Sequence, residues 1–110
     1  MPVDRLLPSS EARELISLVR EISDRELAPR ADTAEAAGEF PRDLVRLLGR
    51  SGLLGLPYEE GGDQPYEVYL QVIEEVATRW LTMALSISGH TLSCWPRAVF
   101  GTPAQRARWL

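Results

Sequence analysis

The chain has 110 residues, 45% of them hydrophobic, and a formal net charge of −4, a size that suits one domain with a real core. All 12 basic residues are Arg and none of them cluster, which argues against nucleic acid or an anionic membrane as partner. The single Cys94 excludes a disulfide within the chain and indicates a reducing, cytoplasmic setting. The N-terminus lacks the pattern of a signal peptide.

The first expected helix follows a short arm. Residues 1–8 show no periodicity, so we expect them to be flexible. Ser9 or Ser10 can cap a helix. Pro29 is expected either to kink this helix or to end it. The Ala- and Glu-rich segment that follows, up to Gly38, could extend the helix. The apolar face of this helix consists of Ala12, Leu15, Ile16, Val19, Ile22 and Leu27.

Proline opens the second expected helix and glycine closes it. Pro41 suits the first helical position, Phe40 can fold back as a hydrophobic staple, and Gly52 ends the helix. The segment from Gly55 to Pro65 is expected to be a loop. Its Gly-Gly pair lacks a following Lys and has acidic neighbours, so phosphate binding is not expected. The buried face is expected to hold Leu44, Val45, Leu47 and Leu48.

A third amphipathic helix is expected to begin at Tyr66. Glu74 and Glu75 resemble half of a carboxylate metal site, but the Glu-x-x-His motifs of such sites are absent. We therefore expect a solvated edge for both, and no metal. The apolar side is predicted to hold Tyr66, Tyr69, Leu70, Ile73, Val76, Ala77 and Trp80.

The segment from Trp80 to Pro96 is an uncharged run of 17 residues. Large apolar residues alternate with small ones around the whole circumference, which predicts a helix that other elements surround. The run is short and contains Ser86, Ser88, His90, Thr91 and Ser93, which disfavours a membrane span. Pro96 predicts a bend. We therefore expect a buried central helix that reaches about Phe100.

His90 and Cys94 lie four residues apart, on one helical face. This spacing admits a thiolate–imidazolium pair, but a thiol among apolar residues stays neutral and inert. The simpler interpretation is a His90 that is hydrogen-bonded within a helix bundle. The residues themselves therefore indicate no catalytic group.

The last residues predict a further helix, with Thr102 as cap, Pro103 at the first position and Gln105 completing a capping box. The chain stops on apolar Trp109 and Leu110, so we expect it to be the front part of a longer protein. The expected fold is all-α: an orthogonal or up-down bundle of about five helices around a buried central helix, formed by residues 9–110.

Several motifs together resemble a known family. The runs EFPRDLVRLLGRSGLLGLP, EEGG, IEEVATRW, ALSISGH and VFGTPAQRARWL stand in the order found in the N-terminal helical domain of acyl-CoA dehydrogenases. The resemblance covers nearly the whole chain. It implies a longer flavoenzyme in which a β-sheet domain and a C-terminal helical domain follow, with FAD between those two.

The resemblance also implies an activity for the full-length protein. It would be an oxidoreductase of fatty acid metabolism that oxidises an acyl-CoA or acyl-carrier thioester at its α and β carbons. A glutamate of the C-terminal domain removes the α proton and the flavin takes the β hydride. The present residues would supply no catalytic or cofactor-binding group and would be inactive alone. A homo-oligomer is expected.

By the same resemblance, the central helix contributes part of the acyl-chain tunnel through Leu85, Ser88, Gly89 and Leu92. Ser88 and Gly89 are small enough to leave room, while the two leucines offer an apolar lining. Small residues in a helix also serve close helix packing, and that interpretation stays open.

Two other functions remain possible from the sequence. One is a free-standing helical interaction module on the same fold, and the other is a flavin oxidase or monooxygenase of the same superfamily. Under the dehydrogenase interpretation, the isolated chain should expose an apolar patch and self-associate.

Overall fold

The structure, a computed structural model, describes residues 4–58 and 66–110, and within these ranges it is entirely helical. The all-α prediction is confirmed. The Gly61-Gly62 pair and the loop around it lie outside the described residues. The helices are α1 (Ser10–Ile22), a π-helical turn (Ser23–Leu27), α2 (Ala28–Ala37), α3 (Arg42–Arg50), α4 (Tyr66–Ala77), α5 (Leu81–Phe100) and α6 (Pro103–Trp109).

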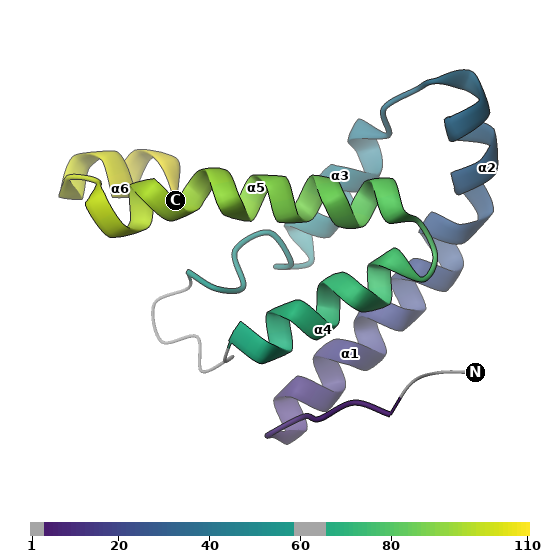
Figure 1. The fold of residues 1–110 in the computed structure, drawn as a ribbon, viewed down its shortest axis with the longest axis horizontal. Helices are drawn as coiled ribbons and strands as arrows, with labels where there is room; N and C mark the ends of the chain where they lie inside the picture. Colours follow the sequence, from purple (N-terminus) through teal and green to yellow (C-terminus); the bar gives the residue numbers. More distant parts are fainter. Residues whose placement is uncertain (1–3, 59–65) are drawn as a thin grey trace.

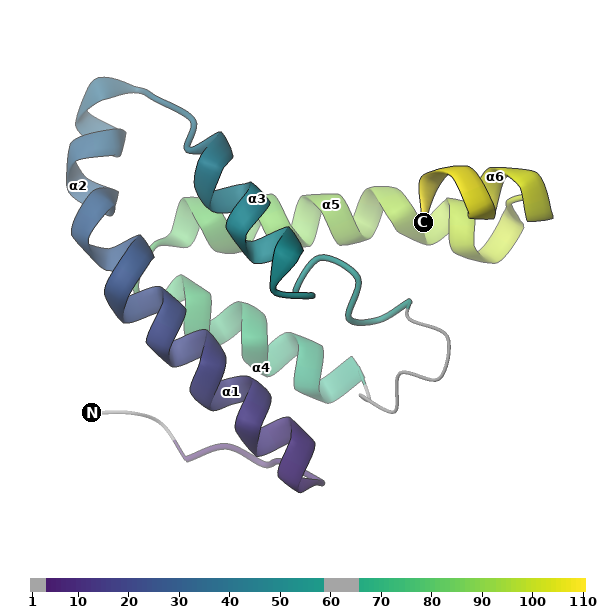
Figure 2. The same ribbon diagram turned by 180° about the vertical axis from the view of Figure 1, so that it is seen from behind.

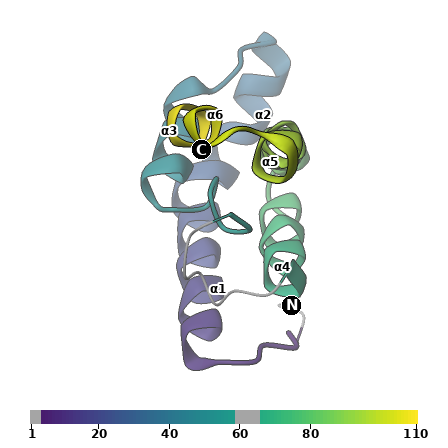
Figure 3. The same cartoon turned by 90° about the vertical axis from the view of Figure 1, so that its left-hand side faces the viewer.

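The helices form two layers. Seen edge-on, α1 and α3 lie on one side and α4 and α5 on the other (Figure 3). The shortest dimension is 18 Å, close to two helix diameters. In the face views, α4 leads into α5 through a tight corner and α6 folds back beside the end of α5 (Figures 1 and 2). Helix α5 therefore has neighbours on one side of its axis.

The first three segments form one continuous rod. Ser9 caps α1, as predicted, through a hydrogen bond that its hydroxyl accepts from the Ala12 amide. Pro29 neither ends the helix nor interrupts it, because a π-helical turn precedes it and the Ala28 amide donates to the Ser23 carbonyl. Such turns absorb an irregular register. The rod ends at Gly38, whose φ of 65° is left-handed.

The end of α3 is a Schellman motif. The Leu53 amide donates to the Leu48 carbonyl and the Gly52 amide to the Gly49 carbonyl, with Gly52 at a φ of 81°, which glycine adopts without steric cost. The motif returns the chain toward the helix, and Leu53 becomes fully buried. This confirms the predicted role of Gly52.

One hydrophobic core joins the layers. It draws on every described helix except α6, and on the segment after α3. Large side chains from α1, α3 and α5 meet there at close to zero exposure, which is the main stabilising contribution to a domain of this kind. Its members are Ile16, Val19, Leu27, Ala31, Leu44, Leu48, Leu53, Leu56, Tyr69, Val72, Val76, Trp80, Met83, Ala84 and Ile87.

The buried face of α4 differs from the predicted one. Tyr66 and Leu70, expected inside, are mostly exposed. Helix α4 packs against both α1 and α5, so the buried sector is wider than one stripe and is turned away from Leu70. It consists of Val68, Tyr69, Val72, Glu75 and Val76.

Glu75 is the centre of a buried ion-pair cluster. The Glu75 residue is 6% exposed. Its Oε1 accepts hydrogen bonds from Arg20 Nε at 3.0 Å and Nη2 at 2.8 Å, and from Arg5 Nε at 2.9 Å. Glu74 pairs with Arg5 but its side chain is 60% exposed. The expected solvated edge is therefore correct for Glu74 and wrong for Glu75, because two guanidinium groups replace the water around its charge.

The segment before α1 is tied to α4. The Leu6 amide donates to Gln71 Oε1 at 3.0 Å, and Gln71 Nε2 donates to the Leu6 carbonyl at 2.9 Å. The Arg5 side chain is only 5% exposed. Residues 4–8 adopt no helix, as predicted. These contacts hold them in place, so the prediction that they form a flexible arm is wrong.

Replacing Glu75 by Gln should lower the free energy of unfolding by about 2–4 kcal/mol, because it leaves two Arg side chains around a neutral group. The matched control is Glu74→Gln, which removes the same charge at an exposed position and should cost about 0–1 kcal/mol. Urea unfolding at neutral pH measures both. Equal losses in the two variants would contradict the buried cluster.

The same carboxylate should make the fold acid-sensitive. Burial would raise the pKa of Glu75, but hydrogen bonds from Arg20 and Arg5 outweigh it and hold that pKa below its ordinary value of 4.5. A depressed pKa stabilises the fold above the unfolded value and loses that contribution as pH falls through the folded value. The unfolding free energy should therefore drop below about pH 4.5, and drop less steeply in Glu75→Gln. Parallel pH profiles for the two proteins would show that other groups cause the loss.

Candidate functional site

Helix α5 begins where a side chain from α2 anchors it. Trp80, in an extended conformation, is its N-cap residue. Glu35 Oε1 accepts a hydrogen bond from Trp80 Nε1 at 2.8 Å and another from the Thr82 hydroxyl. These two hydrogen bonds lower the pKa of Glu35, and the bond from the Thr82 hydroxyl has the larger effect. A carboxylate near a helix N-terminus also interacts favourably with the helix dipole, so Glu35 sets the start and direction of α5.

One face of α5 is core. Helix α5 packs against α4 and α3. Five of its residues at helical spacing are buried, namely Met83, Ala84, Ile87, Thr91 and Cys94. The helix continues through Pro96 to Phe100, which agrees with the predicted extent.

The opposite face carries all four predicted tunnel residues. Leu85 is 63% exposed and Leu92 is 73% exposed, with exposed Gly89 and half-buried Ser88 between them. Positions 85, 88, 89 and 92 follow the 3.6-residue period, so they form one strip that rises about 10 Å along the axis. We call this strip, extended by exposed Leu81, the apolar stripe.

The expectation that α5 is surrounded on every side is therefore correct on one face only. The two-layer arrangement gives α5 neighbours on its core side. Among the residues that the structure describes, none buries the leucines of the stripe. Exposed large apolar side chains in a contiguous row usually mark a surface that binds something.

The stripe offers an apolar surface without free charge. Beside the stripe, the Ser86 hydroxyl donates to the Thr82 carbonyl at 2.8 Å and the Ser93 hydroxyl to the His90 carbonyl at 2.7 Å, so the helix backbone accepts hydrogen bonds from these neighbouring polar groups. A Cβ added at Gly89 would meet no atom within 4 Å. The helix surface is therefore lowest at its centre, between two leucines, and can receive a ligand's hydrocarbon portion there.

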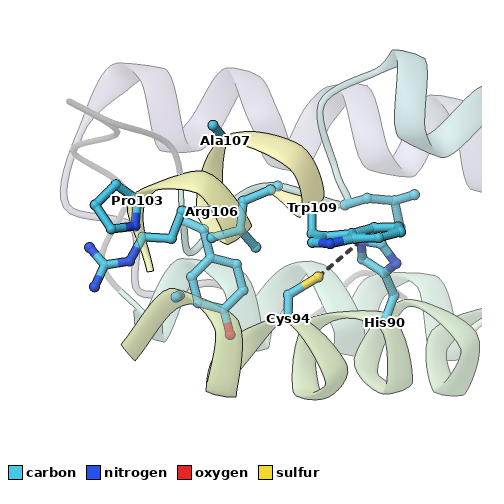
Figure 4. A pocket seen from close by; sticks show the side chains of 11 residues that line it. His90, Cys94, Pro103, Arg106, Ala107 and Trp109 are labelled. Carbon is cyan, nitrogen blue, oxygen red and sulfur yellow. Dashed lines mark hydrogen bonds between the residues drawn. The ribbon is translucent and has the colours of Figure 1, made fainter. Parts of the chain in front are cut away.

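A second feature lies on a different face of α5, toward α6. A hollow of about 860 Å³ is bordered by α5, α6 and residues 54–58, and we call it the His90 hollow. Figure 4 shows His90 and Trp109 at one end, the Arg106 side chain beside Pro103 at the other, and Cys94 between them. His90 Nε2 lies 3.6 Å from Cys94 Sγ. The pair predicted to share a face does so, but His90 is exposed rather than enclosed in a bundle.

Sequence reasoning missed three residues of this hollow. Arg106 and Trp109 come from α6, whose capping box forms as predicted. The Tyr58 hydroxyl donates to the Thr91 carbonyl at 3.0 Å, and burial, followed by the charges of Tyr66 and Cys94, raises its pKa. The spacing of these residues along the chain gives no sign that they meet.

Neither feature provides a metal site or a membrane segment. Among the residues the structure describes, no cluster of three His, Cys, Asp or Glu side chains could hold a metal ion. Within the same ranges, every helix is too short or too polar to cross a bilayer.

Comparison with known proteins gives one consistent result. Residues 9–110 match the family model described as "Acyl-CoA dehydrogenase, N-terminal domain". The chain is 29% identical to "Acyl-CoA dehydrogenase" of Bacillus subtilis over 84% of its length and 26% of that protein's. It is 32% identical to "3-(aryl)acrylate reductase" of Clostridium sporogenes over 86% of its length and 24% of that protein's.

A third relative is "Isovaleryl-CoA dehydrogenase, mitochondrial" of Pongo abelii, 30% identical over 100% of the chain and 28% of the relative. The chain thus spans about a quarter of the length of the curated relatives it matches.

The two faces of α5 should respond oppositely to truncation. Leu85→Ala should change the unfolding free energy by about 0.5 kcal/mol or less and reduce self-association and hydrophobic-dye binding. Ile87→Ala, two residues away on the core face, should cost about 2–4 kcal/mol. Urea unfolding and light scattering measure the two effects. A Leu85→Ala chain that unfolds as easily as Ile87→Ala would show that the stripe is part of the core.

Proposed function

Since the chain belongs to the acyl-CoA dehydrogenase family, whose N-terminal domain it matches, we propose that it works as part of a flavoenzyme that oxidises an acyl thioester. In that reaction the α carbon loses a proton and the β carbon a hydride, which leaves an α,β double bond. FAD, bound elsewhere in the whole protein, supplies the two-electron acceptor. The carrier of the acyl group is coenzyme A or an acyl carrier.

The observation that carries the proposal is the apolar stripe. Leu85, Ser88, Gly89 and Leu92 share the face of α5 that this chain leaves open, and apolar concave surfaces are what bind hydrocarbon ligands. We assign them to one wall of the acyl-chain tunnel. Their position supports this role over helix packing within the domain, because no described neighbour packs against Gly89.

The stripe fits an acyl tail and does not fit the cofactor. The diphosphate of FAD needs cationic side chains or free amides, and α5 has no charged residue between Leu81 and Pro96. The contribution of this domain is therefore binding and orientation: the stripe removes the tail from water and aligns the carbon chain, while the reacting groups belong to other parts of the protein. The domain alone should be inactive.

A second candidate is the reverse reaction, reduction of an α,β-unsaturated acid or thioester. The chain is 32% identical to the relative named 3-(aryl)acrylate reductase, against 29% and 30% for two relatives named dehydrogenases. An oxidase or monooxygenase on the same scaffold requires a reduced flavin that reacts with oxygen, whereas a docking module that uses the stripe for a partner requires no flavin. The free Cys94 thiol supports a reducing, cytoplasmic location, and a homo-oligomer belongs to the same proposal.

The test uses the product of the whole gene. The purified protein should be yellow with bound FAD and should reduce an electron-acceptor dye when given acyl-CoA substrates. Activity only with unsaturated substrates and a reductant would assign the reductase, and rapid reaction of the reduced flavin with oxygen would assign an oxidase or monooxygenase. A protein without flavin would overturn the proposal and favour the docking module.

Substitution of Gly89 separates substrate binding from stability. Gly89→Ala should stabilise the fold by about 0.5–1 kcal/mol, because it lies within a helix and its Cβ has space. In the whole enzyme, Gly89→Leu should raise KM for long or branched acyl chains about tenfold or more and leave short chains nearly unaffected, since a leucine fills the centre of the stripe. The control is Arg97→Gln, at an exposed position of the same helix. Unchanged chain-length preference in Gly89→Leu would remove the stripe from the tunnel.

A further inference from the structure

The charge of the chain is unevenly distributed. Three of the 12 Arg residues lie between Trp80 and Leu110, and none of the 16 acidic residues does. The α5–α6 end is therefore the electropositive part of an otherwise acidic chain. Such a region attracts anions over distances of about 8–10 Å at physiological ionic strength.

The His90 hollow lies within this electropositive end. Arg106 borders it and makes no ion pair with any described residue. The guanidinium and the His90 imidazole lie toward opposite ends, as Figure 4 shows. A free guanidinium offers up to five hydrogen-bond donors in a plane that matches carboxylate or phosphate oxygens.

The wall between these ends is apolar and aromatic. Ala98 and Cys94 form the α5 side, and Trp109 and Leu110 the α6 side. Tyr58 is fixed by its bond to the Thr91 carbonyl, and its phenol is neutral at physiological pH, so it does not repel an anion. The volume of about 860 Å³ lies within the usual range of small-molecule sites.

We propose that the His90 hollow binds an organic anion, whose carboxylate or phosphate pairs with Arg106 and whose apolar body lies between Ala98 and Trp109. This site differs from the apolar stripe, since positions 90, 94 and 98 lie on another face of α5. It also goes beyond the proposed function, because the stripe has no charged group to hold an anionic head. Carboxylates and phosphates share the chemistry that Arg106 recognises.

The 110-residue domain provides two site-specific reporters, because His90 is the only histidine and Cys94 the only cysteine among these residues. The probes are octanoate and octyl phosphate, with octanol and inorganic phosphate as controls for the apolar body and for the charge. Both anionic amphiphiles, or one of them, should slow alkylation of Cys94 in a saturable manner and shift the His90 imidazole resonances. Whichever probe acts identifies the preferred head group, while the two controls should have no effect at the same concentrations.

Two variants test the assignment of the head and the body. Arg106→Gln should weaken binding about tenfold or more, whereas Arg97→Gln, which removes the same charge outside the hollow, should leave it unchanged. Ala98→Leu places a larger side chain in the hollow and should abolish the protection of Cys94 from alkylation. Circular dichroism verifies that both variants fold. Equal protection by octanol, equal weakening by the two Arg variants, or no protection by either amphiphile at millimolar concentrations would overturn the proposal.

Discussion

The structure depends on one constraint: α5 has apolar or small residues all round it, but the two-layer fold gives it neighbours on one side. Met83, Ala84 and Ile87 join the core, and that burial holds both layers together. Leu85 and Leu92 remain in solvent on the far side. The same helix therefore stabilises the domain with one face and presents an exposed apolar surface with the other, so the two faces can be changed independently.

The ion-pair cluster explains how a small domain keeps α5 in place. Helix α4 precedes α5 directly, and Glu75 connects α4 to Arg20 of α1 and to Arg5 of the N-terminal segment. At the other end of the corner, Glu35 binds Trp80 and Thr82. Each carboxylate lowers the freedom of α5 by fixing what lies just before it or at its first turn. The proposed tunnel wall would need this kind of rigidity, because a preformed ligand surface loses less entropy on binding.

The features that the sequence predicted are local ones. The caps at Ser9 and Thr102, the glycine ends at Gly38 and Gly52, and the length of α5 follow from residue chemistry within a few positions, and the structure has them all. Pro29 shows the limit of such rules, because a π-helical turn keeps the helix continuous where the sequence allowed a kink or an end.

The features that the sequence did not predict depend on distant partners. Glu75 and Glu74 are adjacent and chemically identical, and only the positions of Arg5 and Arg20 decide which of them is buried. Leu70 is exposed because α1 and α5 approach α4 from other directions. The His90 hollow combines α5, α6 and the segment after α3, a meeting that no periodicity encodes. Helix α6 contributes nothing to the buried core, so the apolar periodicity that locates the other helices carries no information about where Arg106 and Trp109 lie.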